Sequence, residues 1–138
     1  MTTHSEDETA ALAERLAAGF RGGEVVLLSG ELGAGKTAFV RGLARGVGAD
    51  PAFVSSPTFV LLTSYPGRLT LHHADLYRLR GDGDEVELGL DELPGPRAVL
   101  AVEWAEKLQE LYWEHPVRVH LAHAGDDRRR LRIEEAAA

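Results

Sequence analysis

The residues with the clearest chemistry in this sequence form a glycine-rich stretch in its first third. It reads Gly30-Glu31-Leu32-Gly33-Ala34-Gly35-Lys36-Thr37 and meets every fixed position of the phosphate-loop pattern G-x-x-x-x-G-K-[ST]. Glycines let the backbone wrap closely around phosphates, with several N–H groups pointing inward. We therefore predict that residues 31–37 bind a nucleotide. Lys36 is expected to reach the β- and γ-phosphates, and the Thr37 hydroxyl to bind Mg²⁺.

The segments on either side of this stretch are those that a phosphate loop requires. Val25 to Leu28 is a short apolar run typical of a buried strand. From Ala38 the sequence favours a helix that ends near Gly46 and Gly48, with one apolar face formed by Phe39, Val40, Leu43 and Ala44. The start of that helix would add the positive end of its dipole to the phosphate site.

Two acidic residues come at the ends of other predicted strands. Glu103 follows the buried run Ala98 to Val102, and open α/β sheets bind ligands at the carboxyl ends of their strands. An acid there holds the Mg²⁺ shell or orients water in phosphate-loop enzymes. Asp75 follows Leu69 to Ala74 and is a second candidate for the metal or the attacking water, or else caps the next turn. Trp104 packs either against the site or against the core.

Three hydroxyl residues have two interpretations each. Ser56 and Thr58 lie in and after the loop predicted from Asp50 to Pro57, where nucleotide switches sense the γ-phosphate, but ordinary turn residues have the same composition. Thr9 follows a capping box at Ser5 to Glu8 that predicts the start of a helix. Thr9 either approaches the nucleotide base or is an exposed helical threonine.

Histidines and arginines on the predicted strands give weaker signals. His72, His73, His120 and His123 do not form a compelling metal set, and we interpret them as strand-face histidines. The arginines from Arg128 to Arg132 either meet a base or phosphate or form a solvated sheet edge. No arginine finger can be identified in the sequence.

The remaining pattern predicts an α/β fold with antiparallel hairpins attached to a mostly parallel sheet. One hairpin is expected at residues 59–74 around Pro66-Gly67-Arg68, and a second at residues 117–133 around Gly125-Asp126-Asp127. Leu12, Leu16 and Phe20 have helical spacing before Gly22-Gly23. Ala105 to Tyr112 is predicted to be a helix, and Asp82 to Glu92 an acidic helix or loop.

Composition limits the class of protein. The 138 residues, 44% of them hydrophobic and 27% charged, predict a single soluble domain over residues 1–138. The lack of cysteine excludes disulfides and fits a cytoplasmic protein, and no apolar run is long enough to cross a membrane. The net charge of −7 argues against a protein that holds DNA or RNA by itself, although the acidity could equally serve solubility alone.

Taken together, five blocks of sequence resemble the TsaE (YjeE) ATPases of bacterial tRNA modification. They are the phosphate loop, Ser56-Pro57-Thr58-Phe59, the stretch from His73 to Leu79, Glu87-Leu88-Gly89-Leu90, and Val102-Glu103-Trp104-Ala105-Glu106. The phosphate loop alone fits many NTPase families, so the order and spacing of the other four blocks make the match specific. Ala38 stands where many members have a second threonine, but the metal-binding hydroxyl belongs to Thr37.

The resemblance implies a three-layer phosphate-loop fold and an ATPase that uses ATP and Mg²⁺. It implies a role in making threonylcarbamoyladenosine next to the anticodon of tRNAs that read ANN codons. The family acts through the TsaB–TsaD pair, so contact with tRNA is expected to be indirect, through that complex. By position, Lys36 and Thr37 match the phosphate and Mg²⁺ ligands, and Glu103 the second acidic metal-site residue. Asp75 matches a carboxylate important for hydrolysis, and Trp104 a tryptophan near the site.

Two other functions fit the phosphate loop. A small-molecule kinase would need an acceptor pocket and usually an arginine-bearing lid, and the acidic segment from Asp82 to Glu92 is a poor lid. A non-enzymatic scaffold would use ATP only to control docking. Because no arginine finger is evident, we expect slow hydrolysis by the isolated protein and faster hydrolysis when a partner completes the site.

Overall fold

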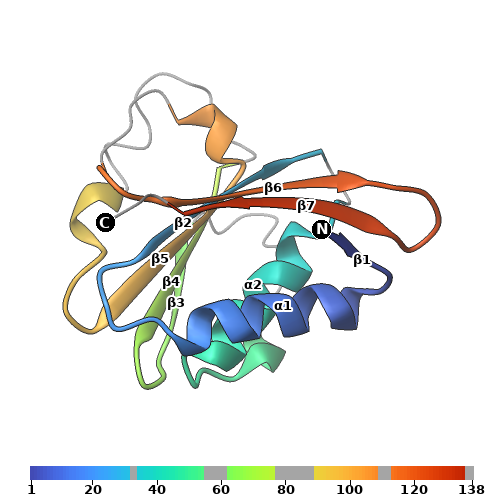
Figure 1. The fold of residues 1–138 in the computed structure, drawn as a ribbon. Coiled ribbons are helices and arrows are strands. Elements are labelled where there is room, and N and C mark those ends of the chain that lie inside the picture. Colours follow the sequence, from blue (N-terminus) through green and yellow to red (C-terminus); the bar gives the residue numbers. More distant parts are fainter. Residues whose placement is uncertain (32–33, 55–61, 77–88, 109–112, 136–138) are drawn as a thin grey trace.

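The chain folds around one seven-stranded mixed sheet with the order β1-β7-β6-β2-β5-β4-β3 (Figure 1). The computed structural model describes residues 1–31, 34–54, 62–76, 89–108 and 113–135. The strands are β1 (Thr2–Thr3), β2 (Val25–Gly30), β3 (Leu62–Tyr65), β4 (Thr70–Asp75), β5 (Ala98–Glu103), β6 (Val117–His123) and β7 (Arg129–Glu134). The helices are α1 (Glu6–Ala18) and α2 (Lys36–Gly46), with short 3₁₀ turns η1 (Pro51–Phe53), η2 (Leu90–Glu92) and η3 (Ala105–Lys107).

The middle of the sheet is parallel and its edges are antiparallel. Strands β6, β2, β5 and β4 pair in parallel, whereas β3 pairs antiparallel with β4, and β7 with both β6 and β1. The predicted α/β class, its mostly parallel sheet and both hairpins are therefore confirmed. Of the first hairpin, residues 59–61 lie outside the described residues, as do residues 82–88 of the acidic segment.

The strand before the phosphate loop is buried on both faces. Val26 and Leu28 pack into the core on the side of the two helices, while Val25 and Leu27 belong to a second apolar cluster on the other side. Such a strand has no polar face, which is why its sequence is a continuous apolar run rather than an alternating one. This central position gives the loop that follows β2 a rigid base.

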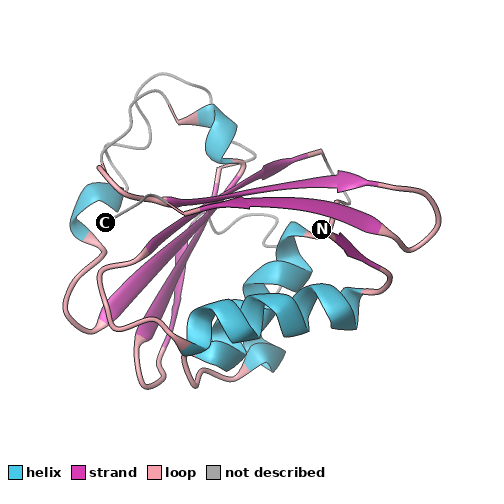
Figure 2. Cartoon of the chain, viewed as in Figure 1, coloured by secondary structure: helices cyan, strands magenta, loops and turns pink. Residues whose placement is uncertain are grey.

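Helices α1 and α2 lie together on one side of the sheet (Figure 2). Their approach depends on a glycine: a Cβ at Gly42 would lie 2.0 Å from the backbone oxygen of Ala10. The small residues Ala10, Ala13 and Ala17 of α1 are buried in this contact. Because α2 begins at Lys36, this close packing also holds the end of the phosphate loop in place. No helix among the described residues is long and apolar enough to cross a membrane.

The start of α1 differs from its prediction in one respect. Ser5 caps the helix as expected, its hydroxyl accepting a hydrogen bond from the Glu8 N–H at 3.0 Å. Thr9, however, is fully buried, and its hydroxyl contacts those of Thr3 at 2.6 Å and the Ser5 carbonyl at 3.2 Å. The interpretation of Thr9 as an exposed threonine is therefore wrong. A contact between Thr9 and a nucleotide base would require this buried pair of hydroxyls to open.

The helix predicted from Ala105 to Tyr112 is also corrected. The structure has a single 3₁₀ turn, η3, after which Leu108 is extended, with φ of −65° and ψ of 131°. Trp104 has a left-handed backbone conformation, with φ of 59°. This changes the direction of the chain just before Ala105, where the predicted helix would begin. Leu108 instead packs against the second apolar cluster, so tertiary packing overrides local helix propensity. Residues 109–112 lie outside the described residues.

Candidate functional site

The phosphate loop leaves β2 at Gly30 and enters α2 at Lys36, and its residues Leu32 and Gly33 lie outside the described residues. Gly35 immediately precedes the helix with φ of 101°, a left-handed conformation that glycine adopts without strain. It has no side chain to cap the first turn of α2. The N–H groups of that turn are therefore left for an anion, which the helix dipole also favours.

Lys36 is folded back onto its own loop. Its Nζ donates to the carbonyls of Gly30 at 2.5 Å and Glu31 at 3.0 Å, and lies 3.8 Å from the centre of a Trp104 ring. The side chain is buried, and this desolvation lowers its pKa below the usual 10.5. Four nearby carboxylates oppose that shift, with Glu106 first, followed by Glu103, Asp75 and Glu31. The lysine thus occupies an acidic environment in the absence of phosphate.

The two predicted strand-end acids lie side by side. Asp75 ends β4 and Glu103 ends β5, and the parallel register pairs them directly. Both are buried, at 7% and 3% exposure. The Thr37 hydroxyl, in the first turn of α2, donates to Oε1 of Glu103 at 3.5 Å. The structure therefore brings together the hydroxyl and the carboxylate to which the sequence assigned the metal, and sets Asp75 next to them.

His73, which the sequence analysis interpreted only as a strand-face histidine, completes this group. His73 Nε2 lies 2.5 Å from Oε2 of Glu103, and its side chain is 1% exposed. A ring proton on Nε2 would donate this bond to the carboxylate, and Nδ1 has no hydrogen-bond partner among the described residues. Glu103 is therefore held between His73 and Thr37. His73 precedes Asp75 by two residues and shares its strand face, a spacing that could have pointed to this role.

A second missed residue is Glu106. The reversed backbone at Trp104 turns the chain back through η3, so that Oε2 of Glu106 accepts a hydrogen bond from the Gly30 N–H at 3.2 Å. Trp104 itself packs against both the core cluster and the Lys36 ammonium. Both alternatives for Trp104 therefore hold at once.

Arg129 belongs to the arginines for which the sequence allowed two interpretations, a contact with a base or phosphate or a solvated sheet edge. It begins β7, and a Cβ on Gly35 would lie 3.7 Å from Arg129 Cγ and 3.8 Å from its Nε. Its Nη1 donates to the backbone oxygens of Arg128 at 3.0 Å and Asp126 at 3.4 Å. Its Nε is buried without a hydrogen-bond partner among the described residues. Arg128, Arg130 and Arg132 are exposed, so the solvated-edge interpretation fits these three and not Arg129.

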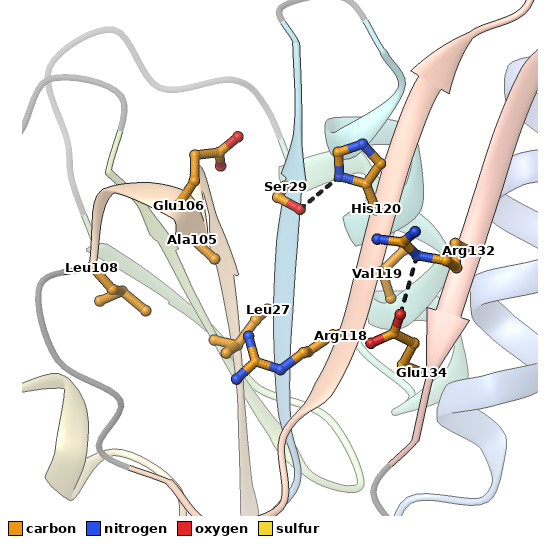
Figure 3. Close-up of a pocket in the computed structure, with 10 residues that line it drawn as sticks. All are labelled: Leu27, Ser29, Ala105, Glu106, Leu108, Arg118, Val119, His120, Arg132 and Glu134. Atoms are coloured by element: carbon orange, nitrogen blue, oxygen red, sulfur yellow. Dashed lines mark hydrogen bonds and ion pairs between the residues drawn. The ribbon is translucent and has the colours of Figure 1, made fainter.

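A cavity lies on the sheet face opposite the helices (Figure 3). It has a volume of about 470 Å³, and polar side chains of β6 and β7 form one wall. There Ser29 Oγ lies 3.0 Å from His120 Nδ1, and Arg132 Nε lies 3.1 Å from Glu134. Glu106 belongs to its lining, whereas Lys36, Thr37, Asp75 and Glu103 are not among its described lining residues. Glu106 therefore contacts both this cavity and the start of the phosphate loop.

Some predicted features cannot be compared with the structure. Ser56 and Thr58 lie outside the described residues. Within the described ranges, no cluster of three or more histidine, aspartate or glutamate side chains has the arrangement of a metal site. His72 lies on β4, and His120 and His123 lie on β6, whereas His73 belongs to the interior of the site.

Comparison with known proteins agrees with this geometry. Residues 3–131 match the family described as "Threonylcarbamoyl adenosine biosynthesis protein TsaE". The chain is 39% identical over 130 residues to the TsaE protein of Bacillus subtilis, covering 94% of this chain and 80% of the relative. It is 45% identical over 130 residues to that of Streptomyces coelicolor, covering 91% and 78%. Both relatives are named tRNA threonylcarbamoyladenosine biosynthesis proteins.

A solved structure supports the same relationship. The crystal structure of Bacillus subtilis YdiB superposes with a TM-score of 0.73 and 33% identity, covering 99% of this chain and 84% of the other. The parallel sheet, the phosphate loop between β2 and α2, and the strand-end acids are those of a phosphate-loop fold. The chain belongs to the TsaE family of tRNA threonylcarbamoyladenosine biosynthesis proteins.

Proposed function

We propose that this chain is a single-domain, Mg²⁺-dependent ATPase that serves the threonylcarbamoyladenosine modification of tRNA. The observation that carries the proposal is the convergence of Lys36 and Thr37, at the start of α2, with Glu103 at the end of β5. The Thr37–Glu103 distance of 3.5 Å joins the phosphate loop to the carboxylate edge of the sheet. This contact supports the proposal because it would bring a phosphate-binding group together with an acid able to act on metal or water.

Mg²⁺ fits the donor set at this point. Magnesium prefers oxygen ligands and is usually held by one or two protein groups together with substrate phosphates and water. Thr37 and Glu103 offer a hydroxyl and a carboxylate oxygen, and His73 fixes the other carboxylate oxygen at 2.5 Å. The ion, when bound, would neutralise charge on the β- and γ-phosphates.

The chain's own groups would then do the remaining work. Lys36 would leave the carbonyls of Gly30 and Glu31 and bind phosphate, and residues 31–37 would provide backbone N–H groups. The buried carboxylates of Asp75 and Glu103 would orient the attacking water. Trp104 would cover the lysine and limit the access of bulk water to it.

The charge of the described site supports a dependence of hydrolysis on a partner protein. Phosphoryl transfer needs positive charge on the γ-phosphate, and four carboxylates surround Lys36. We therefore propose that the TsaB–TsaD pair completes the site and stimulates hydrolysis, and that tRNA is reached through that complex. The ATP cycle would reset the complex, and the threonylcarbamoyl transfer itself would belong to the partners.

Three variants test the division of roles. Lys36→Ala should abolish both ATP binding and hydrolysis, because Lys36 would bind the phosphates directly. Asp75→Asn and Glu103→Gln should retain ATP binding and lower the hydrolysis rate, because these acids would act on water and metal. Calorimetry with ATP and a phosphate-release assay, each with and without TsaB–TsaD, measure the two quantities. Equal loss of ATP binding in all three variants would refute this division.

The same assays separate the rival functions. A kinase would transfer phosphate to a metabolite rather than to water, and none of Lys36, Thr37 and Glu103 belongs to the described lining of the 470 Å³ cavity. A scaffold would require ATP binding alone. If Glu103→Gln bound ATP, lost hydrolysis and still supported modification with TsaB–TsaD, the scaffold would replace the ATPase in this proposal.

A further inference from the structure

The two carboxylate oxygens of Glu103 have different partners. The parallel register aligns His73 of β4 with Ala101 of β5, so Glu103 is the diagonal neighbour of His73, two residues further along β5. His73 Nε2 lies 2.5 Å from Oε2 of Glu103, whereas the Thr37 hydroxyl donates to Oε1 at 3.5 Å. Oε2 is therefore bound to the neighbouring strand, and Oε1 is the oxygen that contacts the start of α2.

The contact between His73 and Glu103 lies deep in the sheet. The two side chains are 1% and 3% exposed, and their strands β4 and β5 each pair with a neighbour on both sides. Tyr65 of β3 lies beside the imidazole, with ring centroids 6.4 Å apart. Nδ1 of His73 has no hydrogen-bond partner among the described residues, so Glu103 is the only such partner of the ring there. Rotation of the carboxylate would leave a second buried nitrogen unpaired, which disfavours that rotation.

We infer that His73 makes the site select Mg²⁺ over Ca²⁺, by keeping Glu103 from binding a metal ion with both oxygens. The inference rests on the proposed function, since it concerns the carboxylate that would hold Mg²⁺ there. Magnesium demands a near-octahedral shell, which a carboxylate that binds through both oxygens distorts, whereas calcium accepts carboxylates through one oxygen or both. Because His73 holds Oε2, Glu103 offers Oε1 alone, and calcium loses a ligand that magnesium does not need.

Two variants separate the hydrogen bond from the packing of the ring. His73→Leu fills a similar volume without a donor, whereas the amide nitrogen of His73→Gln can take the place of Nε2 and donate to Glu103. His72→Gln is the matched control, because His72 is the adjacent histidine of β4 and its Nδ1 contacts Ser64 at 2.7 Å. Thermal unfolding of each variant verifies the fold. If His73→Leu is unfolded, His73→Asn replaces it, since its shorter amide ends before the position of Nε2.

Calorimetric binding of a non-hydrolysable ATP analogue in Mg²⁺, in Ca²⁺ and in EDTA tests the inference without relying on turnover. The wild-type protein should bind the analogue more tightly with Mg²⁺ than with Ca²⁺. His73→Leu should reduce this ratio of affinities by about ten-fold or more, the usual effect of losing the hydrogen-bond partner of a metal ligand. His73→Gln should retain most of the ratio, and His72→Gln all of it. Affinity in EDTA should be similar for every variant, because His73 would act on the metal and not on the phosphates.

The outcomes separate the inference from the proposed function. An unchanged ratio in His73→Leu, or a wild-type protein that binds equally well with either ion, would overturn the inference and leave the ATPase proposal intact. An equal loss in His73→Gln would also overturn it, because the shape of the ring and not its donor would then matter. A loss in EDTA as large as in Mg²⁺, or an equal loss in His72→Gln, would overturn it too. Failure of the wild-type protein to bind the analogue under all three conditions would overturn the proposed function itself.

Discussion

Removing the charge of Glu106 should tighten nucleotide binding. Glu106 accepts a hydrogen bond from Gly30 N–H and is the first of the four carboxylates that hold the Lys36 pKa up against desolvation. In the ligand-free protein it therefore stands in for phosphate charge. When a triphosphate arrives, the same carboxylate becomes a like charge beside the ligand. Glu106→Gln keeps an acceptor for the Gly30 N–H and removes only the charge.

The size of the effect follows from the exposure of this side chain. Glu106 is exposed, so its interaction with a charge is screened by water, and such interactions are worth up to about 1 kcal/mol. Loss of the carboxylate also takes away support for protonated Lys36, but the phosphates restore it on binding. A net gain of about 1 kcal/mol corresponds to roughly five-fold tighter binding.

Calorimetric titration with ATP at 50 mM and 500 mM salt measures this effect. The gain should shrink at the higher salt concentration, because screening shortens the reach of an exposed charge. Glu134→Gln is the matched control, since Glu134 lines the same cavity as Glu106 and is paired with Arg132 (Figure 3). Unchanged or weaker binding by Glu106→Gln, or a gain that is independent of salt, would refute the electrostatic reasoning.

Two further predictions concern stability. Gly42→Ala should lower the free energy of unfolding by about 2 kcal/mol or more, because its Cβ would lie 2.0 Å from the Ala10 oxygen and force α1 and α2 apart. Thermal unfolding beside Gly95→Ala, where a Cβ meets nothing within 4 Å, checks this, and equal midpoints would contradict it. Burial lowers the pKa of His72 below 6.5, so the unfolded chain binds more protons and stability should fall as the pH drops below 6.5. His72→Gln should flatten that fall in melting temperature between pH 7 and pH 5, and identical slopes would show that other groups cause it.

Much of the fold was predictable because its signals are local. The apolar run before Gly30, the fixed positions of the phosphate loop and the turn residues of both hairpins each specify structure within a few residues. The pairing of Asp75 with Glu103 was predictable from a rule of topology, since parallel strands bring their carboxyl ends to one edge. These features give the site its outline.

The contacts that tune the site were not predictable, because they depend on side chains distant in sequence. Glu106 reaches Gly30 only because Trp104 reverses the backbone, and nothing in its neighbours' composition marks that reversal. His73 has the spacing of any alternating strand residue. Its role depends on its contact with Glu103, which is 30 residues away in the sequence. The expected helix after Ala105 failed for the same reason, since packing of Leu108 outweighed local propensity.

The placement of Glu106 distinguishes a local electrostatic effect from the net charge of the chain. Glu106 belongs to the set of carboxylates that act on Lys36. A triphosphate bound between Lys36 and the start of α2 would be repelled by this carboxylate. Loss of the Glu106 charge should therefore strengthen binding. If overall charge alone governed affinity, substituting Glu134 would strengthen binding just as far, so the matched control separates the two explanations.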